Sequence, residues 1–146
     1  MKTMVSTVVG NVVVVLHGEA PPREEEWARY IGLIRERDLL KTASIVFTDG
    51  GAPSSKQRAE INEILAGRHP RGAVVSHNPL LRGVITALAL VNPQTRSFSP
   101  DKLADAFTFL KLTRDEIAAV QQTLEALCAE IGFRPKSLPR LAPSTT

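Results

Sequence analysis

The stretch FTDGGAPSSKQRAEI, residues 47–61, changes from a buried strand to an amphipathic helix within a few residues. It continues the apolar run ASIVF at 43–47, which is typical of a strand covered on both faces. Ser54 and Gln57 have the spacing of a capping box, and an apolar stripe follows them at helical spacing. The stretch therefore predicts a strand, a loop rich in glycine and serine, and a helix that begins at Ser54 and ends near Gly67.

The residues before this stretch predict a hairpin and a helix. Two valine-rich runs, at 4–9 and 12–16, are separated by Gly10 and Asn11, a pair that favours a two-residue hairpin loop. After them, acids crowd one turn and apolar residues then recur at helical spacing between 23 and 40. We expect antiparallel strands at the start of the chain, followed by the first helix.

Strand and helix patterns alternate through the rest of the chain. They predict strands at 71–77 and 95–98, an apolar helix at 79–91, and helices at 99–110 and 113–131. Parallel strands joined by helices form right-handed crossovers. The predicted fold class is α/β: an N-terminal β-hairpin leads into a mostly parallel sheet of four to five strands with four to five helices.

Length and composition indicate one domain. The chain has 146 residues, of which 43% are hydrophobic and 23% are charged, as in an ordinary globular protein. We assign residues 1–132 to this domain. Residues 133–146 contain Pro135, Pro139 and Pro143, and they predict an extended or disordered tail.

Several classes of protein are disfavoured by the sequence. The net charge is +3 and the basic residues are scattered, which argues against specific nucleic-acid binding. No run approaches the roughly 20 apolar residues of a membrane span, and polar residues interrupt the first 20 residues, unlike a signal peptide. The single Cys128 excludes an intrachain disulfide. We therefore expect a cytoplasmic protein without a transmembrane segment.

Polar residues follow three of the predicted strands, and the carboxyl ends of parallel strands are where ligands bind in open α/β sheets. We expect these residues to lie at one edge of the sheet: His17, Asp49, His77 and Asn78. The loop at the start of the second helix adds candidates for a contact or phosphorylation site, which are Asp49, Gly50, Gly51, Ser54 and Ser55. Ser54 is also a helix cap by its position, and a phosphate on either serine would be attracted by the free amides of the helix.

The order of these elements resembles the STAS domain, the fold of bacterial anti-sigma-factor antagonists. The segment TRSFSPDKLADAFTFL, residues 95–110, is similar to the end of the SpoIIAA-like proteins, and the resemblance covers roughly residues 4–131. In the antagonists, an Asp-Ser-Ser/Thr-Gly-Leu motif carries the hydroxyl that a kinase phosphorylates. Asp49 matches the acid, and Ser54 or Ser55 matches the hydroxyl after an intervening GGAP. The resemblance implies a bacterial signalling domain that binds a protein partner.

The sequence supports three functional hypotheses. The first is a non-enzymatic regulatory domain that binds a protein through the loop at the start of the second helix. The second is a small-ligand or lipid-binding module with an apolar space under the helices at 79–91 and 99–110. The third is a serine hydrolase in which His17 or His77 is the base, Asp49 orients it, and Ser54 or Ser55 is the nucleophile.

Metal and cofactor sites are not predicted. The three histidines lack the spacing of metal ligands, and no nucleotide-binding motif is present. The apolar stripe at 113–131 fits either packing within the domain or a homodimer.

Overall fold

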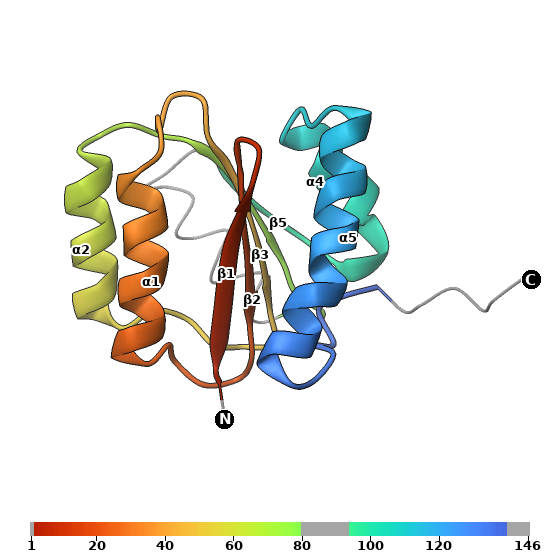
Figure 1. Cartoon of the computed structure of the whole chain (residues 1–146), viewed down its shortest axis with the longest axis horizontal. Helices are drawn as coiled ribbons and strands as arrows, with labels where there is room; N and C mark the ends of the chain where they lie inside the picture. Colours follow the sequence, from red (N-terminus) through yellow and green to blue (C-terminus); the bar gives the residue numbers. More distant parts are fainter. Residues whose placement is uncertain (1, 80–93, 140–146) are drawn as a thin grey trace, which may run out of the picture.

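The computed structural model describes residues 2–79 and 94–139, which form a three-layer α/β domain (Figure 1). A five-stranded sheet has the order β1-β2-β3-β4-β5. β1 is antiparallel to β2, and the other neighbours are parallel, as the sequence predicts. The strands are β1 (Met4–Val9), β2 (Val12–His17), β3 (Ala43–Thr48), β4 (Arg71–Val75) and β5 (Thr95–Phe98).

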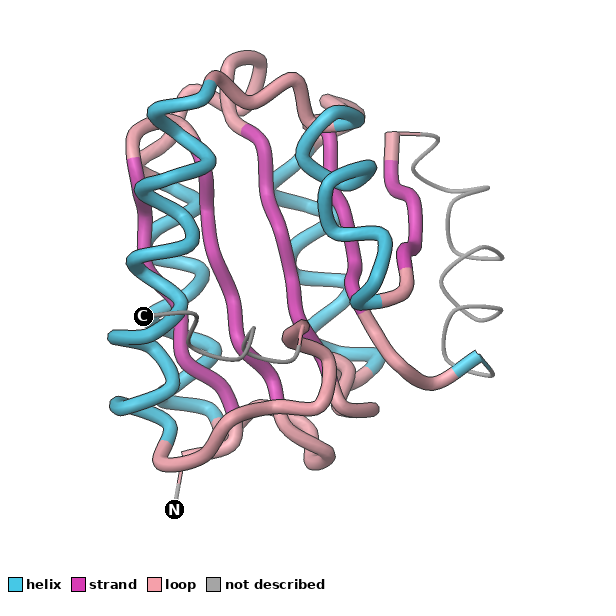
Figure 2. Tube along the Cα trace, turned by 90° about the vertical axis from the view of Figure 1, so that its right-hand side faces the viewer, coloured by secondary structure: helices cyan, strands magenta, loops and turns pink. Residues whose placement is uncertain are grey.

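Among the described residues, two helices lie on each face of the sheet (Figures 1 and 2). On one face lie α1 (Glu24–Arg35) and α2 (Ser55–Leu65). On the other lie α4 (Leu103–Phe109), which follows a short 3-10 turn at Pro100–Lys102, and α5 (Arg114–Ile131).

Strand β2 is the centre of the core, because all six of its residues are buried. Val12, Val14 and Leu16 pack with α4 and α5, while Val13 and Val15 pack with α1. A strand buried on both faces needs apolar residues at every position, which explains the uninterrupted valine run. Gly10 has a φ of +57°, a left-handed conformation that favours glycine, and it turns the chain back from β1 into β2.

The two helical layers are packed to different extents. Helix α5 buries Val120, Leu124, Leu127 and Ile131, so its apolar stripe packs within the domain. Helix α2 buries none of its residues completely, and its apolar side chains are only partly covered by the sheet and α1. The layer beneath α2 is therefore the more loosely filled of the two.

The start of α2 confirms the capping box predicted at Ser54. The Ser54 hydroxyl accepts a hydrogen bond from the Gln57 amide, and the Gln57 side chain accepts one from the Ser54 amide. Thr113 and Glu116 make the same reciprocal pair at the start of α5. These bonds satisfy amides that have no partner inside the helix.

Glu26 joins α1 to β1, a role that its position in an acidic run does not reveal. Its carboxylate accepts hydrogen bonds from the amides of Thr3, Met4 and Arg23 and from the Thr3 hydroxyl. Burial opposes ionisation of Glu26, but these bonds outweigh it and lower the pKa of the carboxyl.

The segment after α5 corrects the predicted domain boundary at residue 132. Pro135, Ser137 and Leu138 are buried, and Leu138 belongs to the same cluster as α5. The Ser137 amide donates a hydrogen bond of 2.9 Å to Asp49 Oδ1, which fixes the segment against the end of β3. Residues 133–139 are thus part of the domain. Apolar burial and this bond hold them against it, although their prolines are typical of an extended tail.

Two predictions lie outside the described residues: most of the apolar helix at 79–91, and the tail at 140–146. Within the described ranges, no helix is both long and apolar enough to cross a membrane.

Replacing Asp49 tests the attachment of the C-terminal segment. We expect Asp49→Ala to lower the free energy of unfolding by about 1 to 2 kcal/mol, because the buried Ser137 amide loses its acceptor. Asp49→Asn keeps an acceptor oxygen, so its free energy of unfolding should decrease less. Urea unfolding measures both changes, and amide exchange at Ser137 should accelerate in the alanine variant. Unchanged stability together with unchanged Ser137 protection would contradict this attachment.

Candidate functional site

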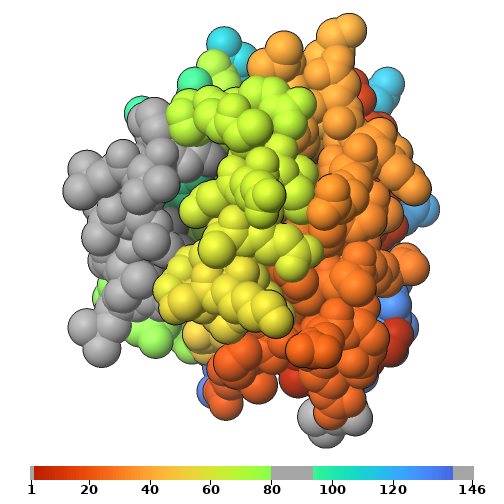
Figure 3. Space-filling model, turned by 90° about the vertical axis from the view of Figure 1, so that its left-hand side faces the viewer, coloured from red at the N-terminus to blue at the C-terminus, as the bar shows by residue number. Residues whose placement is uncertain are grey.

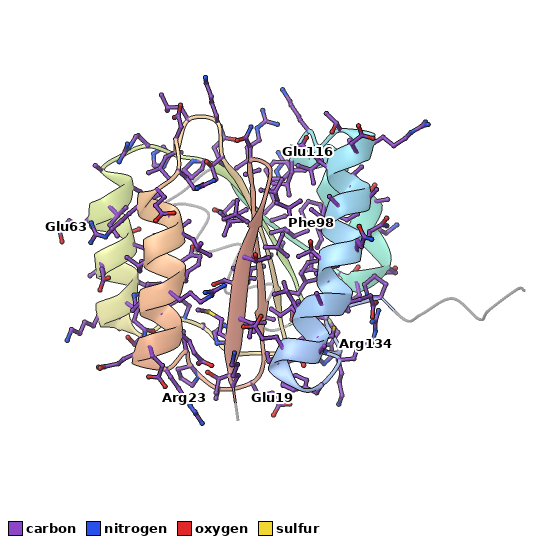
Figure 4. All side chains as sticks on the ribbon, viewed as in Figure 1. Glu19, Arg23, Glu63, Phe98, Glu116 and Arg134 are labelled. Carbon is purple, nitrogen blue, oxygen red and sulfur yellow. The ribbon has the colours of Figure 1, made fainter. Side chains whose placement is uncertain are left out.

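The carboxyl ends of the parallel strands lie at one edge of the sheet, at the lower end of the molecule in Figure 1. His17 ends β2 opposite Thr48, and Asp49 follows β3 directly. Residues 77 and 78 follow β4, which pairs with β3 on its other side. The topology therefore brings the predicted strand-end residues to the same edge. Figure 4 shows Glu19 and Arg23, from the connection between β2 and α1, at this end of the molecule.

Backbone hydrogen bonds continue past the ends of β2 and β3 and hold the glycine loop. The Asp49 amide donates to the His17 carbonyl at 3.0 Å, and the Gly51 amide donates to the Gly18 carbonyl at 2.8 Å. The Thr48 hydroxyl donates to the Gly51 carbonyl at 2.7 Å and accepts from the Gly50 amide at 3.1 Å. These bonds restrain the glycine loop against the end of β2.

Gly51 is required by close packing. A Cβ atom built at this position would lie 2.5 Å from the Ala20 carbonyl and 2.6 Å from His17 Nε2, well inside van der Waals contact. Gly50 instead has a φ of +135°, which side chains rarely adopt. The two glycines therefore let the loop pass close to the end of β2, and neither of these requirements points to a ligand.

His17 is buried and has a fixed hydrogen bond. Its Nε2 atom lies 2.7 Å from the Ala20 carbonyl, which can only accept, so Nε2 carries the proton. Burial lowers the pKa of His17, although the Ala20 bond and the Glu26 charge oppose this effect. The side chain is a neutral structural donor.

The two serines at the start of α2 have different environments. Ser54 is the N-cap, and Gln57 also donates from Nε2 to the Pro22 carbonyl at 3.3 Å, which ties the start of α2 to the loop before α1. Ser55 is exposed, and its hydroxyl accepts from Arg58 Nη2 at 3.1 Å. The first turn of α2 contains no acidic residue to complement its free amides.

In the described part of the chain, the residues of the hydrolase hypothesis form hydrogen bonds with other groups and not with one another. Asp49 accepts from the Ser137 amide, His17 donates to the Ala20 carbonyl, and Ser54 accepts from the Gln57 amide. His77 is exposed, and the Asn78 amide donates to the Ser76 hydroxyl. Among the described residues, these hydrogen bonds do not join a serine, a histidine and an acid in the order that a catalytic triad needs.

A polar depression of about 410 Å³ lies beside this edge, between the start of the chain and the segment after α5. Its cationic groups are already paired in part: Lys2 lies 3.0 Å from Glu130, and Arg134 lies 2.9 Å from Glu125. Arg134 also donates to the Pro139 carbonyl. Lys2 thus ties the start of the chain to α5, and Arg134 ties the C-terminal segment to it, whereas Lys136 of the described wall forms no salt bridge there.

An apolar cavity of about 170 Å³ lies between the sheet and the helices α1 and α2. Figure 3 shows these helices side by side over this face of the sheet. The described wall is made almost entirely of apolar surface and contains no Lys, Arg, Asp or Glu: Met4, Val15, His17, Trp27, Tyr30, Val46, Thr48, Gly51, Ala52, Pro53, Ile61 and Val74. An adjoining space of about 190 Å³ shares Tyr30, Val46, Ile61 and Val74.

The polar side chains of the cavity wall differ in their hydrogen bonding. His17 and Thr48 donate to backbone carbonyls. The Trp27 indole Nε1–H is buried and has no acceptor among the described residues. Burial raises the pKa of Tyr30 to about 12, so its hydroxyl remains neutral. The described part of the wall is therefore uncharged near neutral pH, and its buried Trp27 N–H has no partner there.

The sequence did not reveal this cavity, although it predicted the helix at 23–40 that supplies Trp27 and Tyr30 to the wall. A missing volume depends on how far α2 stands from the sheet, and a residue pattern does not encode that distance. One available signal was the low volume of the facing side chains, because Val46, Val74 and Ala52 leave space that larger residues would fill.

Within the described residues, no group of three or more His, Cys, Asp or Glu side chains is arranged to hold a metal ion. Comparison with protein-family models, with curated proteins and with solved structures finds no match.

The buried His17 predicts a loss of stability in mild acid. Because its pKa is lower in the folded chain than the ordinary value of 6.5, the unfolded chain binds more protons as the pH falls through 6.5. We expect the free energy of unfolding to decrease from about pH 7.5 to about pH 5.5, and His17→Gln to reduce this slope. Urea titrations at each pH provide the measurement, with the exposed His77→Gln as control. An identical slope in wild type and His17→Gln would refute the assignment.

Proposed function

We propose that this protein is a non-catalytic binding domain that takes a small apolar molecule between α2 and the sheet. The observation that supports it best is the apolar cavity of about 170 Å³, whose described wall carries no charged side chain. An apolar cavity of about 150 Å³ in another protein remains dry and binds benzene, so a volume of this size suits one aromatic ring. The partial burial of α2 adds support, because a loosely packed helix adjusts to a ligand at low cost.

This location differs from the one that the sequence suggested for a small ligand. That hypothesis placed an apolar space under the helices at 79–91 and 99–110. Helix α4 instead packs its buried Ala106 and Phe107 into the filled core on the opposite face. The cavity beneath α1 and α2 is therefore the basis of the proposal.

A matched pair of substitutions tests binding in the cavity. We expect ethylbenzene to bind the wild-type protein and Ala52→Leu to weaken its affinity by about tenfold, because the larger side chain occupies the cavity. Ala59→Leu adds the same volume at an exposed position of α2 and should leave the affinity unchanged. Ligand-observed NMR and calorimetry measure the affinities. Equal loss in both variants, or no binding to wild type, would argue against this site.

A second candidate function, binding of a regulatory protein partner, is favoured by the environment of Ser55. Its hydroxyl is exposed, lies beside Arg58, and is located in a helix turn without an acidic side chain. A phosphate at this position would interact with the free amides, with the helix dipole and with the guanidinium. We propose that phosphorylation of Ser55 alters a protein contact on the outer face of α2.

The two serines should respond differently to substitution. Ser54→Ala should lower the free energy of unfolding by about 1 kcal/mol, because the Gln57 amide loses its cap. Ser55→Glu should change the set of proteins recovered in a pull-down, with Ser55→Ala as the control that removes the hydroxyl without adding charge. Thermal unfolding and the pull-down are measured for all variants. The assignment is wrong if Ser54→Ala leaves stability intact but abolishes partner recovery.

A further inference from the structure

We propose that the ligand of the cavity beneath α1 and α2 is uncharged, has about the size of one aromatic ring, and carries a hydrogen-bond acceptor that pairs with the Trp27 indole N–H. This inference rests on the proposed function of the cavity and adds the chemical class of its ligand. Suitable acceptors are a ketone or amide carbonyl, an ether oxygen or a ring nitrogen.

The main observation is the state of Trp27. The side chain is only 6% exposed, and its Nε1–H finds no acceptor among the described residues. A buried donor without a partner is costly, so buried tryptophans usually have one. Trp27 belongs to the wall of the cavity of about 170 Å³ and not to that of the adjoining space, which places its ring beside the vacant volume.

The other polar groups of the wall support the same ligand class. The His17 and Thr48 donors are bonded to the Ala20 and Gly51 carbonyls, so the wall has already used them. No charged side chain of the described wall would balance an ionised ligand. An ion without a partner is far more costly to bury than a neutral molecule. The apolar surface, the unpaired Trp27 N–H and the neutral Tyr30 hydroxyl of the described wall therefore suit an uncharged ligand with an acceptor.

The chain offers a direct reporter of this bond, because Trp27 is its single tryptophan. In a ¹H–¹⁵N spectrum the protein has one indole N–H resonance. Ethylbenzene and acetophenone have similar shapes, but only acetophenone carries a carbonyl acceptor. We expect acetophenone to shift the indole proton downfield and ethylbenzene to leave it without a downfield shift.

The affinity ratio of the two ligands gives a second readout. Trp27→Phe removes the N–H and keeps an aromatic ring in the wall. We expect this variant to lower the affinity for acetophenone by about five- to tenfold relative to the affinity for ethylbenzene. This factor corresponds to the net contribution of a typical hydrogen bond. If the variant fails to fold, the indole shift of the wild-type protein still decides the question.

The outcomes separate this inference from the proposed function. A downfield shift with acetophenone supports both. Binding of both ligands without that shift, and with the same affinity ratio in Trp27→Phe, overturns the acceptor and leaves ligand binding intact. Binding of neither ligand overturns the proposed function and this inference with it.

Discussion

The burial of β2 on both faces is the constraint on which the rest of the structure depends. Valine or leucine at positions 12–16 supplies apolar contacts to α4 and α5 on one side and to α1 on the other. β2 pairs with β1 through an antiparallel hairpin and with β3 through a parallel crossover that contains α1. This arrangement fixes the strand ends at a single edge, where the chain must hold several polar residues close together.

The chain meets that requirement with internal hydrogen bonds. His17, Thr48 and Asp49 each bond to a backbone group nearby or to the segment after α5. The edge where open α/β sheets commonly bind ligands is thus stabilised as part of the core. The apolar cavity extends from this edge beneath α2, where the small side chains Val46 and Val74 face a helix that is only partly buried. His17 and Thr48 therefore belong both to the hydrogen-bonded strand ends and to the cavity wall.

The two proposals involve opposite sides of the same helix. The inner side of α2 borders the cavity through Ile61, and its first turn presents Ser55 and Arg58 to solvent. Gln57 ties this turn to the Pro22 carbonyl, which lies just before α1. A ligand that changes the separation of α2 from the sheet would therefore act on the contacts at the start of the helix. Coupling between the two sites is measurable as reciprocal changes in affinity.

The sequence by itself determined the local structure and the class of fold. Valine runs, the Gly10 turn and the capping boxes at Ser54 and Thr113 are set by contacts within a few residues, and each was predictable for that reason. The tertiary structure alone decided the partners of Asp49, the packing of residues 133–139 and the unpaired Trp27 N–H, which depend on groups far apart in the chain. It also decided the cavity, because an empty volume is set by the distance between packed layers and not by any residue pattern.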